Sequence, residues 1–290
     1  LSLSMLLIFI PRANVSANRI ADVLEKPVSI KDPAVPVQFE QPVKGVVEFH
    51  DVEFRYPDAE EDMLHDVSFK AEPGKVTAII GSTGSGKSTL INLLPRFFDV
   101  SKGKITIDNV DIRDVPQAVL RDQIGYAPQR GLLFSGTVAT NLLVAKPDAT
   151  EEEMRDAVTV AQAADFVLES EEGLNMPISQ GGDNVSGGQR QRLSIARAII
   201  KPRPIYIFDD SFSALDFKTD SELRRALRPH IANSTVLIIT QRVSTAKNSD
   251  QIIVLDNGRV VGKGNHQDLM TSCETYQEIA SSQLSAEELA

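Results

Sequence analysis

The sequence predicts an α/β fold that combines a mainly parallel sheet with an antiparallel section and a helical insertion. The short apolar runs VTAII (76–80), IYIFD (205–209) and TVLIIT (235–240) are typical of parallel strands buried on both faces. QIIVLD-NG-RVV (251–261) predicts a hairpin with an Asn-Gly turn. The stretch between about 130 and 200 has helical character. Strands that alternate with helices favour an α/β sheet.

Composition limits the class of protein. The chain has 290 residues and is 42% hydrophobic, enough for one large core or two modest ones. Its formal net charge of −10 argues against a nucleic-acid-binding surface, so no nucleic-acid partner is expected. Cys273 is the only cysteine, which excludes a disulfide framework and fits a reducing compartment.

The chain begins with an apolar segment, LSLSMLLIFI (1–10), that is too short to span a bilayer. It also lacks the basic region and cleavage site of a signal peptide. One interpretation is a buried core helix. We favour the end of a transmembrane helix, because the segment continues into the polar, Arg-bearing PRANVSANRIADVLEK (11–26). Residues 1–26 are thus expected to be the end of the last transmembrane helix and its cytoplasmic extension.

Proline spacing and composition mark the following boundaries. Residues 27–44 are expected to form a linker, and a globular domain is expected over residues 45–282. Residues 283–290 are expected to be an acidic, solvated tail. The linker contains four prolines: Pro27, Pro33, Pro36 and Pro42.

Local patterns within this domain predict its first strands and one helix start. VVEFHDVEF (46–54) alternates as a half-buried strand, and VTAII (76–80) follows as a buried one. Thr150 and Glu153 match a capping box, which predicts a helix over TEEEMRDAVTVAQAADFVLES (150–170).

A phosphate-binding loop lies directly after the strand predicted at 76–80. GSTGSGKS (81–88) matches G-x-x-x-x-G-K-[S/T], in which backbone N–H groups and a helix N-terminus converge on phosphates. Lys87 is expected to reach the β- and γ-phosphates, and the Ser88 hydroxyl to bind Mg²⁺. The expected nucleotide ligands here are Gly81, Ser82, Thr83, Gly84, Ser85, Gly86, Lys87, Ser88 and Thr89.

A second glycine-rich helix start is Ser186-Gly187-Gly188-Gln189, about 20 residues before IYIFDD. Its bare chemistry is that of an anion site. Alone it would be better interpreted as a loop capped by Ser186. Together with the phosphate-binding loop and IYIFDD, however, it makes the chain resemble the ATP-binding cassette (ABC) family over roughly residues 46–280.

The resemblance implies a P-loop NTPase (RecA-like) core sheet with an antiparallel β-subdomain and an α-helical signature subdomain at about 130–200. SGGQ is similar to the ABC signature, which binds the nucleotide of a partner cassette. Asp209 is similar to the Walker B aspartate that holds Mg²⁺ through water. Gln129 of YAPQ is similar to the Q-loop glutamine, a ligand of Mg²⁺ and water that faces the membrane domain. Ser213-Ala-Leu-Asp216 resembles the D-loop, and Tyr56 is similar to the aromatic residue that stacks on adenine.

The sequence departs from the family pattern at the catalytic centre. Asp210 stands where the family has a glutamate that polarises the attacking water, and Gln241 stands where it has a histidine. A shorter carboxylate and an amide are poorly suited to these roles. A milder departure lies just before the signature, where Ser179-Gln180 stands in place of the Gly-Glu that exporters usually have. With Lys87 and Gln129, Asp210 and Gln241 form the expected catalytic set.

The resemblance therefore implies an ABC-type ATPase subunit that binds ATP and Mg²⁺ at a site of weak hydrolysis. It would be the degenerate subunit of a heterodimeric exporter, with a transmembrane domain in the same polypeptide, at the cell membrane with its cassette on the cytoplasmic side. Its other partner would be a second half-transporter, in a head-to-tail cassette dimer that uses this chain's signature.

Other interpretations remain open. The chain could be a fully active ATPase of a homodimeric exporter, or a regulatory ABC ATPase with no role in transport. The regulatory proteins usually carry coiled-coil or basic arms. An importer cassette would not explain the apolar start and the proline-rich linker. The transported substrate is left open.

Overall fold

The computed structural model describes residues 2–284 and divides the chain into two compact units, Leu1–Lys31 and Asp32–Ala290. The first unit contains helix α1 (Ser2–Leu24), which continues through Pro11. Ile8, Phe9 and Ile10 are exposed within this unit, and the interpretation of the segment as a buried core helix stays untested. Within residues 2–284 no helix has both the length and the apolar character needed to cross a membrane. The end of a transmembrane helix stays a prediction for residues 1–26.

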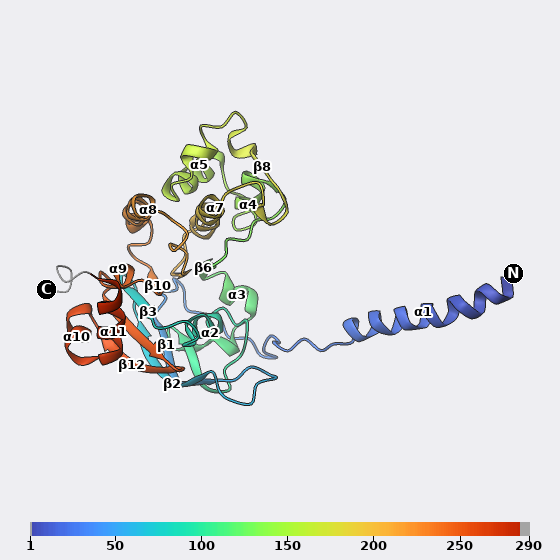
Figure 1. The fold of residues 1–290 in the computed structure, drawn as a ribbon, viewed down its shortest axis with the longest axis horizontal. Helices are drawn as coiled ribbons and strands as arrows, with labels where there is room; N and C mark the ends of the chain where they lie inside the picture. Colours follow the sequence, from blue (N-terminus) through green and yellow to red (C-terminus); the bar gives the residue numbers. More distant parts are fainter. Residues whose placement is uncertain (1, 285–290) are drawn as a thin grey trace. The chain divides into compact units, whose positions relative to one another are not determined.

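The second unit is built on a six-stranded sheet with the order β12-β11-β3-β10-β9-β6 (Figure 1). All neighbouring strands are parallel except β12, which pairs antiparallel with β11 in the predicted hairpin. The predicted strands at 76–80, 205–209 and 235–240 are thus confirmed. The strands are β3 (Val76–Ile80), β6 (Ile124–Ala127), β9 (Ile205–Asp209), β10 (Thr235–Thr240), β11 (Gln251–Asp256) and β12 (Arg259–Gly264).

The register of the central strands brings their carboxyl ends to one edge of the sheet. Thr240 is paired with Ile80 and Ile239 with Asp209, so β3, β10 and β9 end side by side. Ligands of open α/β sheets bind outside the carboxyl ends of the strands. This register therefore predicts that a ligand would bind at the carboxyl edge formed by β3, β10 and β9.

Two smaller sheets complete the strands. The antiparallel sheet has the order β2-β1-β4-β5, and Asp51 interrupts β1 with a φ of 47° where the pairing register shifts. The buried and half-buried pattern of β1 confirms the predicted strand at 46–54. A two-stranded sheet pairs β7 with β8. The bounds are β1 (Val47–Phe54), β2 (Leu64–Ala71), β4 (Lys102–Ile107), β5 (Val110–Asp111), β7 (Gly136–Thr137) and β8 (Pro177–Ile178).

Alternate residues of the buried strands enter different cores. Ile205 and Ile207 of β9 pack in a cluster with helix α2 (Lys87–Leu93) and the antiparallel sheet. Tyr206 and Phe208 point to the opposite face, into a cluster with the helical subdomain. This alternation explains why the strands are apolar throughout: both faces are covered.

The helical subdomain contains the predicted capping box, but the helix that it starts is shorter than predicted. Thr150 and Glu153 make both reciprocal hydrogen bonds of the box and start α5, as predicted. The helix ends at Val160, however, because Gln162 takes a φ of 55° and its N–H and that of Ala163 donate to Thr159 and Val158, a Schellman ending. The helices are α4 (Val138–Leu143), α5 (Glu151–Val160), α6 (Ala164–Val167), α7 (Gly187–Ile199) and α8 (Phe217–His230).

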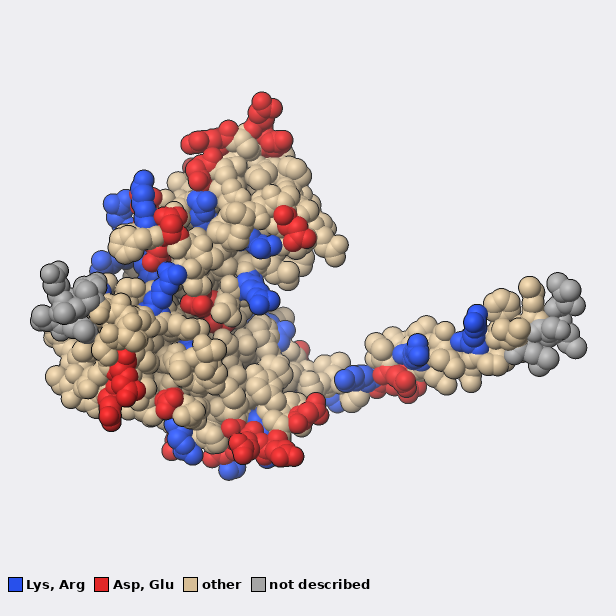
Figure 2. Space-filling model, viewed as in Figure 1, with Lys and Arg blue, Asp and Glu red and all other residues tan. Residues whose placement is uncertain are grey.

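Acidic side chains gather over the outer end of this subdomain (Figure 2). The first turn of α5 contains three acidic residues, Glu151, Glu152 and Glu153. Carboxylates are favourable there because the helix N-terminus carries a partial positive charge.

The C-terminal helices cover part of one face of the main sheet. Ala78 and Ile80 of β3 share a third cluster with Val243, Tyr276 and Ala280. The remaining helices are α3 (Gln117–Arg121), α9 (Val243–Ala246), α10 (His266–Ser272) and α11 (Glu274–Gln283), with short 3-10 turns at Ile112–Asp114, Gly173–Asn175 and Gln180–Gly182. The predicted acidic tail from 285 onward lies outside the described residues.

Residues 32–44, within the predicted linker, contain no helix or strand and belong to the second unit. Phe39 is buried in the core shared with the antiparallel sheet. The Asp32 carboxylate accepts hydrogen bonds from the backbone N–H and the side-chain amide of Gln117. This segment is therefore attached to the globular unit along its length.

The Asn257-Gly258 turn of the hairpin packs against the backbone of Met63. Replacing Gly258 tests how close this contact is. Gly258 has a φ of 73°, and a Cβ there would lie 2.2 Å from the Met63 carbonyl oxygen. Gly258→Ala should therefore lower the free energy of unfolding by about 3 kcal/mol or more. Gly173→Ala is the control, because Gly173 has a φ of 54° but no atom within 4 Å of its Cβ position. It should cost only about 1 kcal/mol. Equal losses in urea denaturation would contradict the steric explanation.

Candidate nucleotide site

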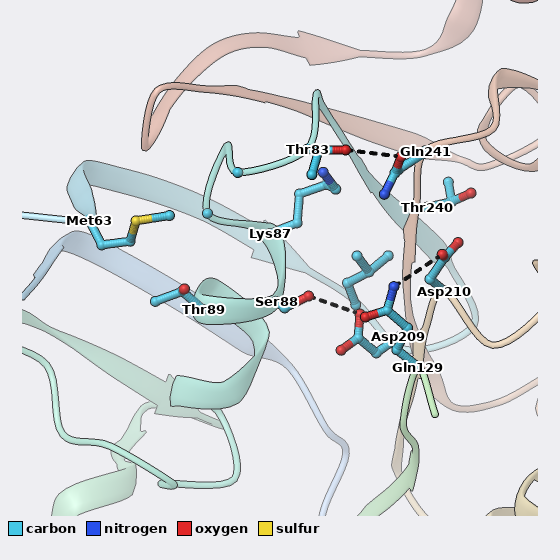
Figure 3. A pocket seen from close by; sticks show the side chains of 13 residues that line it. Met63, Thr83, Lys87, Ser88, Thr89, Gln129, Asp209, Asp210, Thr240 and Gln241 are labelled. Atoms are coloured by element: carbon cyan, nitrogen blue, oxygen red, sulfur yellow. Dashed lines mark hydrogen bonds between the residues drawn. The ribbon is translucent and has the colours of Figure 1, made fainter. Parts of the chain in front are cut away.

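A pocket of about 210 Å³ lies at the carboxyl edge of the main sheet (Figure 3). The loop after β3 forms one wall, and residues at or just beyond the ends of β9, β10 and β6 form the others. Its lining residues are Met63, Thr83, Gly84, Gly86, Lys87, Ser88, Thr89, Gln129, Asp209, Asp210, Ile239, Thr240 and Gln241.

The loop at 81–88 curls around the Lys87 ammonium. Lys87 Nζ donates to the carbonyl oxygens of Gly81 at 2.8 Å and Ser82 at 2.6 Å. Gly86 has a φ of 100° immediately before α2, a conformation that glycine adopts without steric cost. Burial lowers the pKa of Lys87, and the carboxylates of Asp210 and Asp209 oppose that shift. The chain thus places a cation and a helix N-terminus where a phosphate chain would bind.

The Ser88 hydroxyl and the Asp209 carboxylate lie together at the start of α2. Ser88 Oγ donates to Asp209 Oδ1 at 3.4 Å, and the Tyr126 hydroxyl lies 3.5 Å from Asp209 Oδ2. Asp209 is only 5% exposed, and burial raises its pKa. These hard oxygen donors suit Mg²⁺, which usually binds one or two carboxylates together with phosphate oxygens and water. A bound Mg²⁺ would supply positive charge to the phosphates.

Asp210 follows the end of β9 and also lines the pocket. It takes a left-handed φ of 45°, which Asp tolerates better than most residues, and its N–H donates to the Ile239 carbonyl at 2.9 Å. Gln129 Nε2 makes a long contact of 3.5 Å with Asp210 Oδ2. The structure therefore brings the predicted Q-loop residue to the second aspartate, as Figure 3 shows.

Gln241 approaches the pocket from the loop after β10. Its Oε1 accepts a long hydrogen bond of 3.5 Å from Thr83 Oγ1, on the loop that encloses Lys87 (Figure 3). Asp210 and Gln241, the departures expected at the catalytic centre, thus line the same pocket as Lys87. Their roles in catalysis stay predictions.

Tyr56 lies beside this pocket without lining it. Its ring packs edge-on against Phe54 and Phe98, and its hydroxyl lies 3.0 Å from Thr89 Oγ1. Thr89 does line the pocket. Stacking of Tyr56 on adenine stays a prediction.

The signature residues are not in this pocket. Ser186 caps α7 and makes a reciprocal capping box with Gln189, with N···O distances of 3.2 Å and 2.9 Å. The structure therefore separates the predicted nucleotide ligands into the group at 81–89 and the group at 186–189.

The first glycine of this signature has open space around it. A Cβ built on Gly187 would meet no described atom within 4 Å, and the φ of Gly187 lies outside the left-handed region. Among the residues that the structure describes, nothing around position 187 requires glycine.

Sequence reasoning missed several pocket contacts. Met63 lines the pocket from the end of the loop before β2, and its carbonyl faces Gly258 of the hairpin turn. No local pattern indicated it. Tyr126 belongs to the YAPQ motif, and its hydroxyl also lies 3.2 Å from Asn92 Oδ1. That motif is the available signal, although the resemblance assigns a role to Gln129 alone.

The fold is similar to that of a solved full-length transporter. A bacterial Atm1-family ABC exporter with ATP bound superposes with a TM-score of 0.89 at 32% identity, over 98% of this chain and 49% of that chain. This likeness confirms the predicted mixed α/β fold of the P-loop core with its antiparallel and helical subdomains.

Curated relatives align over nearly the whole chain. An ABC transporter ATP-binding protein of Mycobacterium bovis is 47% identical over 97% of this chain and 48% of its own length. An ATP-dependent lipid A-core flippase of Desulfotalea psychrophila is 40% identical over 90% of this chain and 45% of its own length. A putative multidrug export ATP-binding/permease protein of Bacillus subtilis is 39% identical over 82% of this chain and 41% of its own length. The chain thus spans about half the length of the curated relatives it matches.

A family model described as "ABC transporter" matches residues 64–213, which is more than half of the 290 residues. The match includes the loop around Lys87, the signature helix start and Asp209. The resemblance inferred from the motifs is confirmed, and the chain belongs to the ABC transporter family.

Proposed function

We propose that this chain is the ATP-binding cassette of an exporter and that its own pocket binds Mg-ATP but hydrolyses it slowly. The observation that carries the proposal is the presence of Asp210 and Gln241 in the lining of the pocket that holds Lys87. A transmembrane domain in the same polypeptide, at the cell membrane with the cassette on the cytoplasmic side, is part of the proposal. The export and flippase names of the relatives support it.

The pocket contains what binding requires. Lys87 and the N–H groups at the start of α2 provide positive charge, while Ser88 and Asp209 provide oxygen ligands for Mg²⁺. Activating a water for attack on the γ-phosphate requires a carboxylate at the correct distance. The Asp210 side chain is one methylene shorter than glutamate, and the Gln241 amide cannot take up a proton as imidazole does. Binding is thereby retained while proton transfer is impaired.

We further propose that the signature of this chain completes the active site of a second half-transporter, in a heterodimer. Gly187 supports this, because its backbone has open space where a side chain would lie and no conformational need for glycine. Close approach of a ligand from outside the chain explains a glycine at that position. In a homodimer both sites would carry Asp210 and Gln241, and for that reason the heterodimer is preferred. Drugs and lipids both remain candidates for the cargo.

Slow turnover by the chain alone is the first expectation. A fluorescent ATP analogue should bind in the presence of Mg²⁺, while phosphate release should stay far below the roughly ten per second of an ordinary enzyme. Lys87→Ala should abolish binding, because it removes the cation at the loop. Phosphate release near ten per second would contradict the proposed impairment.

Restoring both family residues tests the cause of the slow turnover. Asp210→Glu with Gln241→His should raise hydrolysis at this site by at least about tenfold, and by more than the two single changes combined. Non-additivity is expected because both residues act on one water and one phosphate. Asp62→Glu is the matched control, since it adds a methylene outside the pocket lining. A double variant no faster than the parent would show that another feature silences the site.

The signature is tested most cleanly at Gly187. Gly187→Ala should leave the melting temperature unchanged or slightly raised, since the added methyl meets nothing in this chain. In the complex with the partner it should lower ATPase activity and transport strongly. Asp210→Asn should cost much less, because that carboxylate would not drive the fast reaction. Greater damage from Asp210→Asn would reverse the assignment of the slow site to this chain. Ser186→Ala is a poorer probe, since it also removes the helix cap, worth about 1 kcal/mol.

A further inference from the structure

The side chain of Gln283 bridges the backbone of the loop that presents Gln241. Gln283 Nε2 donates to the Gln241 carbonyl oxygen at 2.8 Å, and Gln283 Oε1 accepts from the Val243 N–H at 3.0 Å. One side-chain amide thus holds both ends of the tripeptide 241–243, which begins 42 residues earlier in the chain. A matched donor and acceptor pair of this kind fixes the loop's position and its orientation.

The bridged loop makes one contact in the lining of the nucleotide pocket and one beside it. Gln241 reaches Thr83 above Lys87, and Arg242 Nη2 donates to the Ser213 carbonyl at 2.9 Å. The Ser213 hydroxyl in turn donates to the carbonyl of Asp210 at 2.7 Å. The loop that Gln283 holds therefore contains Gln241 and is linked through Ser213 to Asp210.

Gln283 is held in place by a packed helix. It is the last residue of α11, and Tyr276 and Ala280 of that helix are fully buried. The next residue, Leu284, is 8% exposed and packs in the cluster that contains Val243 and Ala246. The Gln283 side chain itself is exposed, so its bridge can be removed without opening the core.

We propose that Gln283 is a positioning residue, which holds the 241–243 loop so that Gln241 stays over the phosphate-binding loop and favours ATP over ADP. The inference rests on the proposed function, since it requires that this pocket bind nucleotide. Among the described residues, Gln241 is the only pocket-lining residue to which the Gln283 side chain is hydrogen-bonded, and the bond is to its backbone carbonyl. Its effect should therefore pass through Gln241, and because the proposed function assigns Gln241 to the γ-phosphate, the effect should depend on that phosphate.

The test replaces Gln283 by methionine, which keeps the length of the side chain and removes both hydrogen bonds. Gln277→Met is the matched control, because Gln277 lies on the same helix and donates to the Met270 carbonyl at 2.9 Å, away from the loop. The first measurement is hydrogen exchange of the Val243 amide in the full chain without nucleotide. Gln283→Met should speed that exchange by about tenfold, and Gln277→Met should not change it.

The second measurement compares dissociation constants for Mg-ATP and Mg-ADP. Gln283→Met should weaken Mg-ATP binding by about threefold to tenfold, with little change for Mg-ADP. In a Gln241→Ala background the same change should have no further effect on Mg-ATP. Equal effects on ATP and ADP, or additive effects of the two substitutions, would overturn the inference while leaving the proposed function intact. If the unaltered chain binds neither nucleotide, the proposed function fails. An unchanged Val243 exchange rate overturns the inference in either case.

Discussion

The in-register parallel pairing of β3, β10 and β9 is the constraint on which the site depends. Ile80, Thr240 and Asp209 end their strands at one edge of the sheet. The residues that directly follow these strand ends therefore lie close together at that edge. Burial on both faces holds that register, since a slip by one residue would exchange the side chains that enter the two cores. The phosphate-binding loop, the paired aspartates and Gln241 meet as a result.

Sequence reasoning was most successful where the signal is local. The buried strands are continuous apolar runs, and the loop before α2 is a motif whose glycines and Lys87 act together over a few residues. The predicted helix at 150–170 was too long because Gln162, not a glycine, takes the left-handed conformation that ends α5. Met63 and Gln283 could not be found, because tertiary contacts alone bring them to the site. Gln283 lies 42 residues beyond Gln241 in the chain, and no spacing rule relates them.

The chemistry of the pocket is divided between residues that bind and residues that would activate water. Lys87 and Asp209 are buried, and Lys87 Nζ makes short hydrogen bonds to the carbonyl oxygens of Gly81 and Ser82, so the cation that would bind phosphate is firmly held. Among the described residues, the side chains of Asp210, Gln129 and Gln241 make only long hydrogen-bonding contacts of 3.5 Å. Contacts at that distance contribute little to orientation. Gln283 matters in this setting because it fixes the backbone behind one of these loosely held side chains.

The division of labour between two chains is open to one direct measurement. In the complex of this chain with its partner half-transporter, photoreactive ATP can be labelled either on the α-phosphate or on the γ-phosphate and cross-linked during steady-state turnover. We expect this chain to retain both labels, because its pocket holds ATP that is not hydrolysed, while the partner retains only the α-label. Loss of the γ-label from this chain at the same rate as from the partner would contradict the slow site assigned to Asp210 and Gln241.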